Sequence, residues 1–314
     1  MTTPRVLITG GAGFLGRGIL RRIATHRLAW DPIVFSRDEM KQDICRQQYP
    51  FAKYILGDVR DTDRLMAAME GVDFVVHAAA LKYIPEAELN AAECLAVNIG
   101  GAQAVAKAAL YAEVSRVIGI STDKAVQPVN VYGCSKMAME RLFAEVSSYE
   151  TIFTCVRYGN VIGSTGSVIP LFRRQFTETG SVKVTDPKMT RFWMGVDEAI
   201  DLILTGLQLD GGSIAIPLVR AMTLADTVRA AVGDDTPVEI TGMRPGEKMH
   251  ESLLHHQESV RVVAHTDHLE LLPVVRGAAP NEEGREAFTL ASHTPHYRME
   301  VDEMRKLIAD TEEL

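Results

Sequence analysis

The feature that most constrains this chain is a glycine-rich loop near its N-terminus, which joins a predicted strand to a predicted helix. Residues 9–16 read Thr-Gly-Gly-Ala-Gly-Phe-Leu-Gly. Glycines permit a tight turn and let the backbone approach a pyrophosphate, while the first turn of the helix offers free N–H groups. In this strand–loop–helix setting the pattern predicts a dinucleotide-binding loop. The residues expected to contact the cofactor there are Gly10, Gly13, Phe14, Leu15 and Gly16.

Strand-like and helix-like segments alternate through the first half of the chain. Short apolar runs predict strands at residues 5–9, 32–36, 54–56, 73–78, 116–121 and 153–158. Helical patterns lie between them at residues 15–26, 64–70, 90–111 and 132–147. This alternation predicts an α/β fold with a Rossmann-type doubly wound parallel sheet. We expect a cofactor-binding domain over residues 1–163 and 192–217, with a smaller interleaved C-terminal substrate-binding part over residues 164–191 and 218–314.

Composition narrows the class of protein. The chain has 314 residues, with 33 basic and 41 acidic side chains and a formal net charge of −8, which argues against a surface that coats nucleic acid. Its apolar runs fall far short of the roughly 20 residues that span a bilayer, and its four cysteines match no zinc-binding spacing. We therefore expect a soluble cytoplasmic protein that binds neither nucleic acid nor membrane and holds no metal. Residues 276–285 are expected to form a mobile loop.

The end of the second predicted strand bears on the choice of cofactor. A carboxylate at this position binds the ribose hydroxyls of NAD in dinucleotide-binding folds. Here Ser36 and Arg37 stand there instead, and a hydroxyl with a guanidinium suits the 2′-phosphate of NADP. Lys41 adds a further cation, whereas the acidic residues directly after Arg37 keep NAD open as the alternative. The residues expected to contact the adenine, after the third strand, are Asp58 and Val59.

Two neighbouring motifs predict the chemistry. Tyr132 and Lys136 form a Tyr-x-x-x-Lys pair at the start of a predicted helix, so that they share one face. The ammonium would lower the pKa of the phenol, which would then serve as general base for an alcohol that gives up a hydride. Just before them, residues 121–124 read Ser-Thr-Asp-Lys. Thr122 suffices to hold a substrate oxygen, and Asp123 with Lys124 adds the acid and the base that an elimination next to a ketone requires.

With these motifs the chain resembles the extended short-chain dehydrogenase/reductases. Within that superfamily it is similar to the soluble, C5-inverting UDP-N-acetylglucosamine 4,6-dehydratases of the pseudaminic acid pathway type. The resemblance runs nearly from end to end, and the Ser-Thr-Asp-Lys and Arg-Pro-Gly-Glu-Lys segments are specific to this subgroup. The matching segments are residues 10–16, 35–42, 57–61, 77–82, 121–125, 132–136, 156–161, 189–193 and 244–250.

The resemblance implies a three-step reaction without net redox change. Tyr132 takes the proton of the C4 hydroxyl while hydride passes from C4 to NADP, and the new ketone acidifies the C5 proton. Lys124 then removes that proton while Asp123 protonates the departing C6 hydroxyl, with Thr122 holding the C4 oxygen. Hydride returns to C6 and C5 is reprotonated with inversion, which gives a 4-keto-6-deoxy sugar nucleotide.

The resemblance also implies further binding residues. On the cofactor side these are Ala78, Ala79, Ala80, Lys82 and Asn98, together with Tyr132 and Lys136. On the side of the UDP-sugar they are Lys82, Asn160, Val168, Pro170, Arg191, Arg244 and Glu247. The expected partner is UDP-N-acetylglucosamine, and the relatives lead us to expect at least a homodimer.

Departures from the family pattern lie on the substrate side. The usual Gly-Ser-Arg-Gly-Ser has Thr165 in place of the cation, Tyr83 stands where a His is common, and a Lys-containing stretch near residue 218 is replaced. These changes leave open the sugar, the nucleotide and the stereochemical course at C5. Two other functions also stay open: a UDP-sugar 4-epimerase, which needs no Asp-Lys pair, and a non-catalytic NADP-binding regulator, which typically loses the Tyr or the Lys.

Overall fold

A large central sheet organises the molecule. The computed structural model describes residues 3–148, 150–164, 166–274 and 287–312, so that Thr165 and the loop expected at residues 276–285 lie outside the described residues. The strands of the central sheet are β1 (Arg5–Thr9), β2 (Asp31–Ser36), β3 (Lys53–Leu56), β4 (Phe74–His77), β5 (Arg116–Ile120), β6 (Ile152–Val156), β10 (Ile214–Pro217), β14 (Val262–Ala264) and β15 (His268–Leu271).

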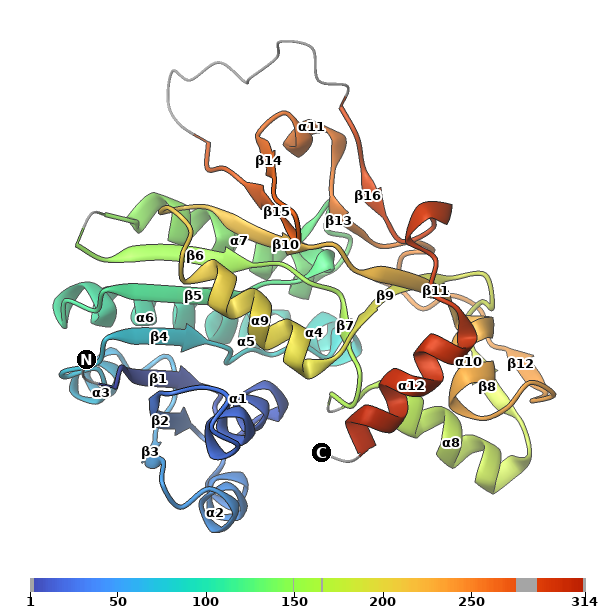
Figure 1. Cartoon of the computed structure of the whole chain (residues 1–314), viewed down its shortest axis with the longest axis horizontal. Coiled ribbons are helices and arrows are strands. Elements are labelled where there is room, and N and C mark those ends of the chain that lie inside the picture. Colours follow the sequence, from blue (N-terminus) through green and yellow to red (C-terminus); the bar gives the residue numbers. More distant parts are fainter. Residues whose placement is uncertain (1–2, 149, 165, 275–286, 313–314) are drawn as a thin grey trace.

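The strand order is that of a doubly wound nucleotide-binding sheet. It runs β14-β15-β10-β6-β5-β4-β1-β2-β3, and the seven strands from β10 to β3 are parallel, whereas β15 and β14 join the edge antiparallel (Figure 1). The part β3-β2-β1-β4-β5-β6 is the Rossmann order. The predicted fold class is therefore confirmed, and the carboxyl ends of β1, β4 and β5 meet at one edge of the sheet.

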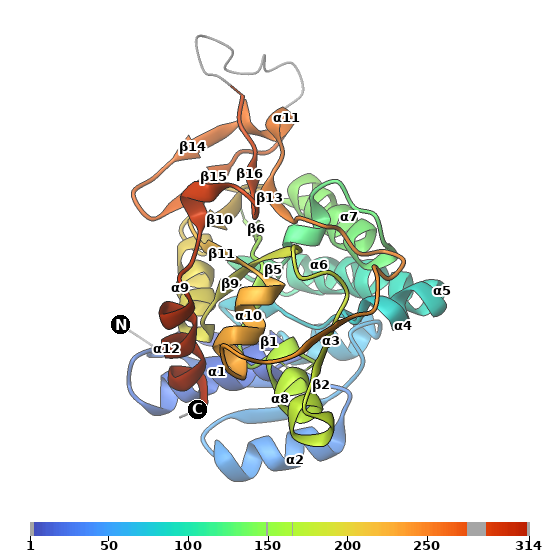
Figure 2. The ribbon, with the colours of Figure 1, turned by 90° about the vertical axis from the view of Figure 1, so that its right-hand side faces the viewer.

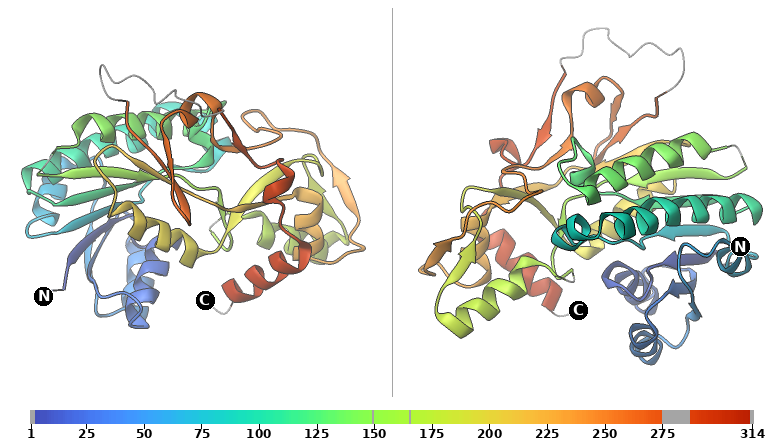
Figure 3. Two further views of the ribbon diagram at one scale, coloured as in Figure 1. Left: turned by 45° about the horizontal axis from the view of Figure 1, so that its top comes forward. Right: turned by 180° about the vertical axis from the view of Figure 1, so that it is seen from behind.

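Helices cover both faces of this sheet. They are α1 (Phe14–Ala24), α2 (Glu39–Gln48), α3 (Thr62–Ala68), α4 (Ile84–Leu89), α5 (Ala91–Leu95), α6 (Gly101–Tyr111), α7 (Val131–Val146) and α9 (Val196–Gly206). α1 and α9 pack together on one face, while α3, α6 and α7 pack on the other (Figure 3). α6 is rich in alanine, and its buried small side chains allow it to approach the sheet closely.

The later part of the chain builds smaller elements beside the carboxyl edge of the sheet (Figure 2). Its strands form the sheets β11-β9-β7, β12-β8 and β13-β16. These strands are β7 (Asn160–Val161), β8 (Val182–Val184), β9 (Thr190–Met194), β11 (Arg220–Thr223), β12 (Val238–Ile240), β13 (Ser252–Leu254) and β16 (Leu290–Ala291). The helices are α8 (Val168–Thr179), α10 (Leu224–Ala231), α11 (His256–Ser259) and α12 (Val301–Glu312). A separate apolar core, which includes Trp193, Met222 and Met304, holds α8, α10 and α12 together.

Several predicted elements differ in detail from the observed ones. The polar helix α2 and the short helix α4 are absent from the sequence prediction. The single helix expected at residues 90–111 is continuous but contains a π-helical turn at Ala96–Gly100. Among the described helices, none combines the length and the hydropathy that crossing a membrane requires.

Candidate functional site

The glycine-rich loop forms a cradle at the start of α1. Gly10 has a left-handed φ of +67°, and a Cβ at this residue would lie 2.9 Å from the backbone of Ala79. A Cβ at Gly16 would lie 2.1 Å from the carbonyl oxygen of Gly11. α1 begins directly after Gly13, and no described side chain caps its first turn. The backbone N–H groups there fit the pyrophosphate of a dinucleotide, as the sequence predicts.

The end of β2 presents a hydroxyl and a guanidinium. The Ser36 hydroxyl accepts a hydrogen bond from the buried Gln42 amide at 3.0 Å, and the same amide donates to the carbonyls of Ser36 and Ile55. Ser36 therefore keeps its own proton for a ligand, and Arg37 beside it is exposed. These two groups fit a phosphate.

Lys41, which was expected to contact the cofactor, has a partner within its own helix. Its Nζ lies 2.9 Å from the carboxylate of Asp38, and that carboxylate also accepts the Lys41 amide as the N-cap of α2. These interactions with Lys41 lower the pKa of Asp38. Lys41 thus neutralises the charge of Asp38, which reduces the electrostatic repulsion of an anion at Ser36 and Arg37.

Asp58 follows β3 at the expected place, but its carboxylate is already engaged. Arg60 donates to both carboxylate oxygens, at 2.9 and 2.7 Å, and also pairs with Glu93. The hydrogen bonds from Arg60 lower the pKa of Asp58. Val59 is buried, with Gly101 against its side chain. An adenine contact by Asp58 would have to share this carboxylate with Arg60, a partner that the sequence prediction did not include.

The loop after β4 closes the cradle from the other side. The Ala79 amide donates to Thr9 Oγ1 at 3.3 Å, and Thr9 Oγ1 lies 2.8 Å from Nδ1 of the fully buried His77. Burial lowers the pKa of His77 to about 3, so the imidazole is neutral at physiological pH. The predicted cofactor contacts Ala78, Ala79 and Ala80 are half-buried at this edge, as are Phe14 and Leu15 at the start of α1.

Asn98 makes several hydrogen bonds within the protein. It is buried in the π-helical turn, where its Oδ1 accepts from the Leu81 amide at 2.8 Å and its Nδ2 donates to the Leu81 carbonyl at 3.0 Å and to Ser135 Oγ at 2.8 Å. These bonds engage both ends of the amide within the protein, and the expected contact with the cofactor stays a prediction. Asn98 fixes the loop that carries the exposed Lys82 against α7.

Asp123 and Lys124 form the centre of the site, in the 3₁₀ turn Asp123–Ala125 that follows β5. Asp123 is fully buried, and its Oδ1 accepts from Thr122 Oγ1 at 2.8 Å and from Lys124 Nζ at 3.0 Å. Its Oδ2 has no hydrogen-bond partner among the described residues. A buried carboxylate oxygen without a partner costs free energy. It is therefore available to a group of a bound substrate.

Tyr132 and Lys136 are both buried at the start of α7. Burial raises the pKa of Tyr132 to about 12, while the nearby Lys124 and hydrogen bonding by Thr122 act to lower it. The ammonium of Lys136 donates to the Ile120 carbonyl at 2.7 Å, at the end of β5. Burial lowers the pKa of Lys136 to about 8. The Lys136 ammonium is thus hydrogen-bonded to a strand carbonyl, and its expected effect on the phenol stays a prediction.

Glu251 belongs to the same cluster, although the sequence analysis did not identify it. It lies directly before β13, is buried, and places its Oε1 3.6 Å from Lys124 Nζ. Its Oε2 lies 3.9 Å from Lys248 Nζ. Burial opposes the charge on Lys124, but Asp123 and Glu251 outweigh burial and raise the pKa of the ammonium. The only sequence signal was that Glu251 follows the matching segment 244–250 directly.

A second buried ionic network lies next to the turn Asp123–Ala125. Arg157 donates to both carboxylate oxygens of Glu140, at 3.0 and 2.7 Å, and to both of Glu258, at 3.1 and 2.9 Å. Ser121, the residue before Thr122, donates to Glu140 as well. The network therefore connects β5, β6 and α7 to α11 of the later part.

Among the predicted substrate residues, Arg191 acts electrostatically on Lys124. It is buried in β9, donates to the carbonyl of Thr190 at 2.7 Å, and is close enough to Lys124 to act against the charge of that ammonium. Arg244 and Glu247 form an ion pair at 2.6 Å in which the arginine is exposed. The structure thus brings these two predicted residues together in the first part of the segment 244–251, whose last residue is Glu251.

Three other predicted substrate residues lie on or near α8. Asn160 is half-buried in β7, beside Trp193 of β9. Val168 packs against the apolar core of the later part. Pro170 is exposed and lines a hollow of about 460 Å³ together with Phe14. Val168 thus packs against this core, and its predicted role in the nucleotide pocket stays a prediction.

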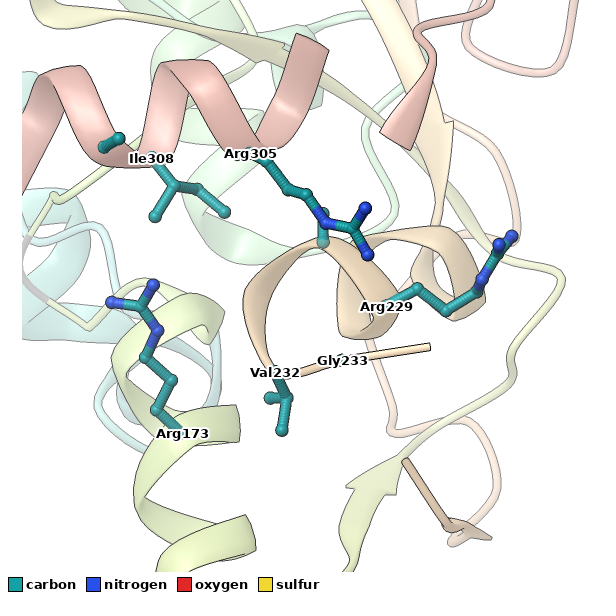
Figure 4. A pocket seen from close by; sticks show the side chains of 8 residues that line it. Arg173, Arg229, Val232, Gly233, Arg305 and Ile308 are labelled. Carbon is teal, nitrogen blue, oxygen red and sulfur yellow. The ribbon is translucent and has the colours of Figure 1, made fainter. Parts of the chain in front are cut away.

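A further hollow lies between α8, α10 and α12, away from the catalytic turn. Its volume is about 340 Å³, and Arg173, Arg229 and Arg305 line it (Figure 4). Arg229 and Arg305 both form ion pairs with Asp234. Its positive charge is thus largely matched within the protein, and neither hollow is lined by the catalytic side chains.

Known proteins resemble the chain over most of its length. The family model described as "Polysaccharide biosynthesis protein" matches residues 6–272. The UDP-N-acetylglucosamine 4,6-dehydratase (inverting) of Campylobacter jejuni is 40% identical over 262 residues, which cover 81% of this chain and 78% of that protein. A UDP-glucose 4-epimerase of Rickettsia bellii is 39% identical over 269 residues, which cover 82% and 79%.

A solved structure resembles the whole chain. It is the X-ray structure of Pen from Bacillus thuringiensis, which is 34% identical to this chain and has a TM-score of 0.89. The match covers 100% of this chain and 99% of that chain. The resemblance to extended short-chain dehydrogenase/reductases that act on sugar nucleotides is confirmed. The match over residues 6–272 shows that this chain belongs to the polysaccharide biosynthesis protein family.

Proposed function

We propose that the chain converts a UDP-N-acetylhexosamine, specifically UDP-N-acetylglucosamine, into a 4-keto-6-deoxy sugar nucleotide, with NADP as cofactor and with inversion at C5. The observation that carries this proposal is the buried Asp123–Lys124 pair next to Tyr132, with one carboxylate oxygen left unpartnered. Oxidation at C4 requires only one base beside the cofactor. A buried acid and base in addition serve an elimination.

The enzyme class follows from the relatives. The C. jejuni protein, a 4,6-dehydratase by name, shares 40% of the aligned residues with this chain, and the chain is a sugar-nucleotide 4,6-dehydratase by that relationship. The nucleotide, the N-acetylated sugar and the stereochemistry at C5 belong to the proposal.

A bound nicotinamide cofactor would supply hydride chemistry at C4 and C6 of the sugar. The residues that would hold it are the cradle of Gly10, Gly13 and Gly16, with Ser36 and Arg37 at the 2′-phosphate. The free hydroxyl proton and the exposed guanidinium support NADP over NAD. Tyr132 would receive the C4 hydroxyl proton, and Lys124 and Thr122 already act to lower the pKa of this phenol against burial.

The Asp123–Lys124 pair can supply both forms that the elimination needs without taking up a proton from outside. One proton passes from Lys124 Nζ to Asp123 Oδ1 along the 3.0 Å hydrogen bond, which leaves a neutral amine and a carboxylic acid. The amine takes the C5 proton, and the acid protonates the C6 oxygen, which leaves as water. The pair then returns to ammonium and carboxylate, so that charge and proton number balance. The unpartnered Oδ2 is the second oxygen of the same acid.

The substrate's diphosphate requires local cations, since the chain as a whole carries a charge of −8. Arg191 and Arg244, with Lys82 on the sheet side, are the proposed ligands. Arg191 approaches Lys124 closely enough to affect its charge, which supports a bound sugar next to the catalytic turn. We also propose that residues 164–191 and 218–314 form the substrate part, and that the protein is a homo-oligomer in the cytoplasm.

4-Epimerisation is the competing activity, because a Rickettsia 4-epimerase is nearly as similar to this chain as the C. jejuni dehydratase. An epimerase uses the base and the cofactor but has no step for Asp123 and Lys124. Asp123 is fully buried, the Lys124 side chain is only 17% exposed, and the hydrogen bond between them favours the dehydratase. The retained Tyr132 and Lys136 argue against a non-catalytic regulator.

Incubation of the purified protein with UDP-N-acetylglucosamine in D₂O, followed by mass spectrometry, separates these activities. Loss of one water with uptake of deuterium is the expected result. An isomeric product of unchanged mass would support the epimerase, and absence of turnover with any UDP-sugar would support the regulator. Lys124→Ala should abolish dehydration while leaving UDP binding intact. Dehydration by this variant would refute the role of Lys124.

A further inference from the structure

The charges around Lys124 come from several elements that are distant in the sequence. Asp123 lies beside it in the same turn, and Tyr132 approaches it from α7. Arg191 faces it from β9, and Glu251 and Lys248 face it from the segment before β13. Three cations and two carboxylates thus share one largely buried cluster.

We propose that Glu251 is a positioning residue of the elimination, which holds the Lys124 ammonium and sets the pH at which this amine loses its proton. The proposal rests on the proposed function only for its kinetic part. Glu251 Oε1 lies 3.6 Å from Lys124 Nζ, and Asp123 Oδ1 lies 3.0 Å from the same atom. Two carboxylates thus approach the ammonium, of which only Asp123 belongs to the predicted catalytic motif.

Glu251 is fixed in place by its backbone. Its amide donates to Ser292 Oγ at 2.9 Å, and its carbonyl accepts from the Ser292 amide at 2.8 Å. Its side chain is buried, and Oε2 has no hydrogen-bond partner within the described part of the chain. A buried carboxylate without full hydrogen bonding is stabilised by nearby cations. Here Lys124 and Lys248 provide them.

This placement controls the proton transfer within the Asp123–Lys124 pair. An anion next to Nζ favours the ammonium, so Glu251 holds the pair in its resting ionic form. Lys248 acts in the opposite direction. Its Nζ is anchored to the Val126 carbonyl at 2.6 Å and lies 3.9 Å from Glu251 Oε2, where it weakens the effect of Glu251 on Lys124. The two side chains of one segment therefore set the proton affinity of the catalytic amine in opposite senses.

The test measures the pH at which Lys124 becomes neutral, without requiring turnover. Purified protein is treated with trace acetic anhydride across a pH series, and acetylation of Lys124 is quantified by mass spectrometry of its peptide. Glu251→Gln should move the midpoint to lower pH by about 1–3 units, the size expected for loss of an opposite charge within 4–6 Å. Lys248→Met should move it to higher pH. Glu258→Gln, which removes a carboxylate that faces Arg157 instead, should leave it unchanged.

The second readout follows elimination of water from UDP-N-acetylglucosamine over the same pH range. The limb of the pH–rate profile that depends on Lys124 should move to lower pH in Glu251→Gln, while UDP affinity stays within about twofold of the parent protein. An unchanged or higher labelling midpoint in Glu251→Gln would overturn the proposal. If that variant does not fold, a lower or unchanged midpoint in Lys248→Met would do so. Absence of turnover by the parent protein would count against the proposed function alone, because labelling does not depend on turnover.

Discussion

Replacement of Arg157 by methionine tests the buried network behind the catalytic turn. Methionine has a similar length and keeps the apolar packing, but it removes the guanidinium. That group makes five hydrogen bonds, two to Glu140, two to Glu258 and one to the Leu253 carbonyl at 3.0 Å. The side chains of Arg157 and Glu140 are each 1% exposed, whereas that of Glu258 is 15% exposed.

The expected loss follows from which group is left unpaired. Breaking a buried ion pair by removing one partner costs about 3–5 kcal/mol, because the other charge remains buried. Glu140 bears that cost, since among the described residues only Ser121 still donates to it. Glu258 lies nearer the surface, so it can turn toward water and adds little. We therefore expect Arg157→Met to lower the free energy of unfolding by about 3–5 kcal/mol, and not by twice that amount.

Urea unfolding followed by tryptophan fluorescence measures this change, since Trp30 and Trp193 are both buried. Arg220→Met is the matched control, because Arg220 pairs with Glu303 at the surface and exposed pairs contribute about 0–1 kcal/mol. A loss of less than about 1 kcal/mol in Arg157→Met, or a loss equal to that of Arg220→Met, would refute the reasoning.

The same network predicts a pH dependence of stability. Burial alone would raise the pKa of Glu258, but the charge and hydrogen bonds of Arg157 outweigh it and lower that pKa below its ordinary value. A carboxylate with a lowered folded-state pKa contributes stability above its unfolded value of about 4.3, and this contribution is lost as pH falls through the folded-state pKa. Unfolding between pH 7 and pH 3 should therefore show a steeper acid loss in the parent protein than in Arg157→Met. Parallel pH curves would contradict this assignment.

Two further changes test the cofactor cradle. Gly10→Ala adds a Cβ 2.9 Å from the Ala79 backbone at a φ of +67°, so calorimetric titration should show NADP affinity reduced at least tenfold, and affinity like that of the parent would disprove the cradle. Gln42→Ala removes the donor to the Ser36 hydroxyl and to the Ser36 and Ile55 carbonyls. It should lower the free energy of unfolding by about 1–3 kcal/mol and reduce the affinity for NADP more than the affinity for NAD. An equal reduction of both affinities would refute a contact between Ser36 and the 2′-phosphate.

The sheet half was predictable because its signals are local. β1 and β4 are short apolar runs with turn residues after them, and the glycine-rich loop marks the start of α1. α2 was missed for the opposite reason, since it buries only Gln42 and Cys45 and thus lacks an apolar stripe. The π-helical turn was missed because it changes the helix over five residues only, where Asn98 turns toward Leu81. Periodicity does not report such a local change.

The same distinction between local and long-range signals applies to the candidate site. Asp123, Lys124 and Tyr132 were predicted because they lie within a few residues of each other, on a strand end and the helix that follows it. Glu251 reaches Lys124 through the topology of the later part, across more than a hundred residues. The direction of the Lys136 ammonium also depends on a tertiary neighbour, the Ile120 carbonyl. Sequence spacing identified which groups can react, whereas the three-dimensional fold determines which charges act on them.

The segment at residues 244–251 connects these two levels. Its first part holds Arg244 and Glu247, the proposed ligands of the nucleotide, and its last part holds Lys248 and Glu251, which face Lys124. Because one short segment carries both sets of charges, a shift that brings Arg244 onto a diphosphate also changes the distance between Glu251 and Lys124. Coulomb energy between charges a few ångströms apart in a buried site changes steeply with distance. If Arg244 and Lys124 act as proposed, we therefore expect binding of the nucleotide to change the pH at which Lys124 is acetylated.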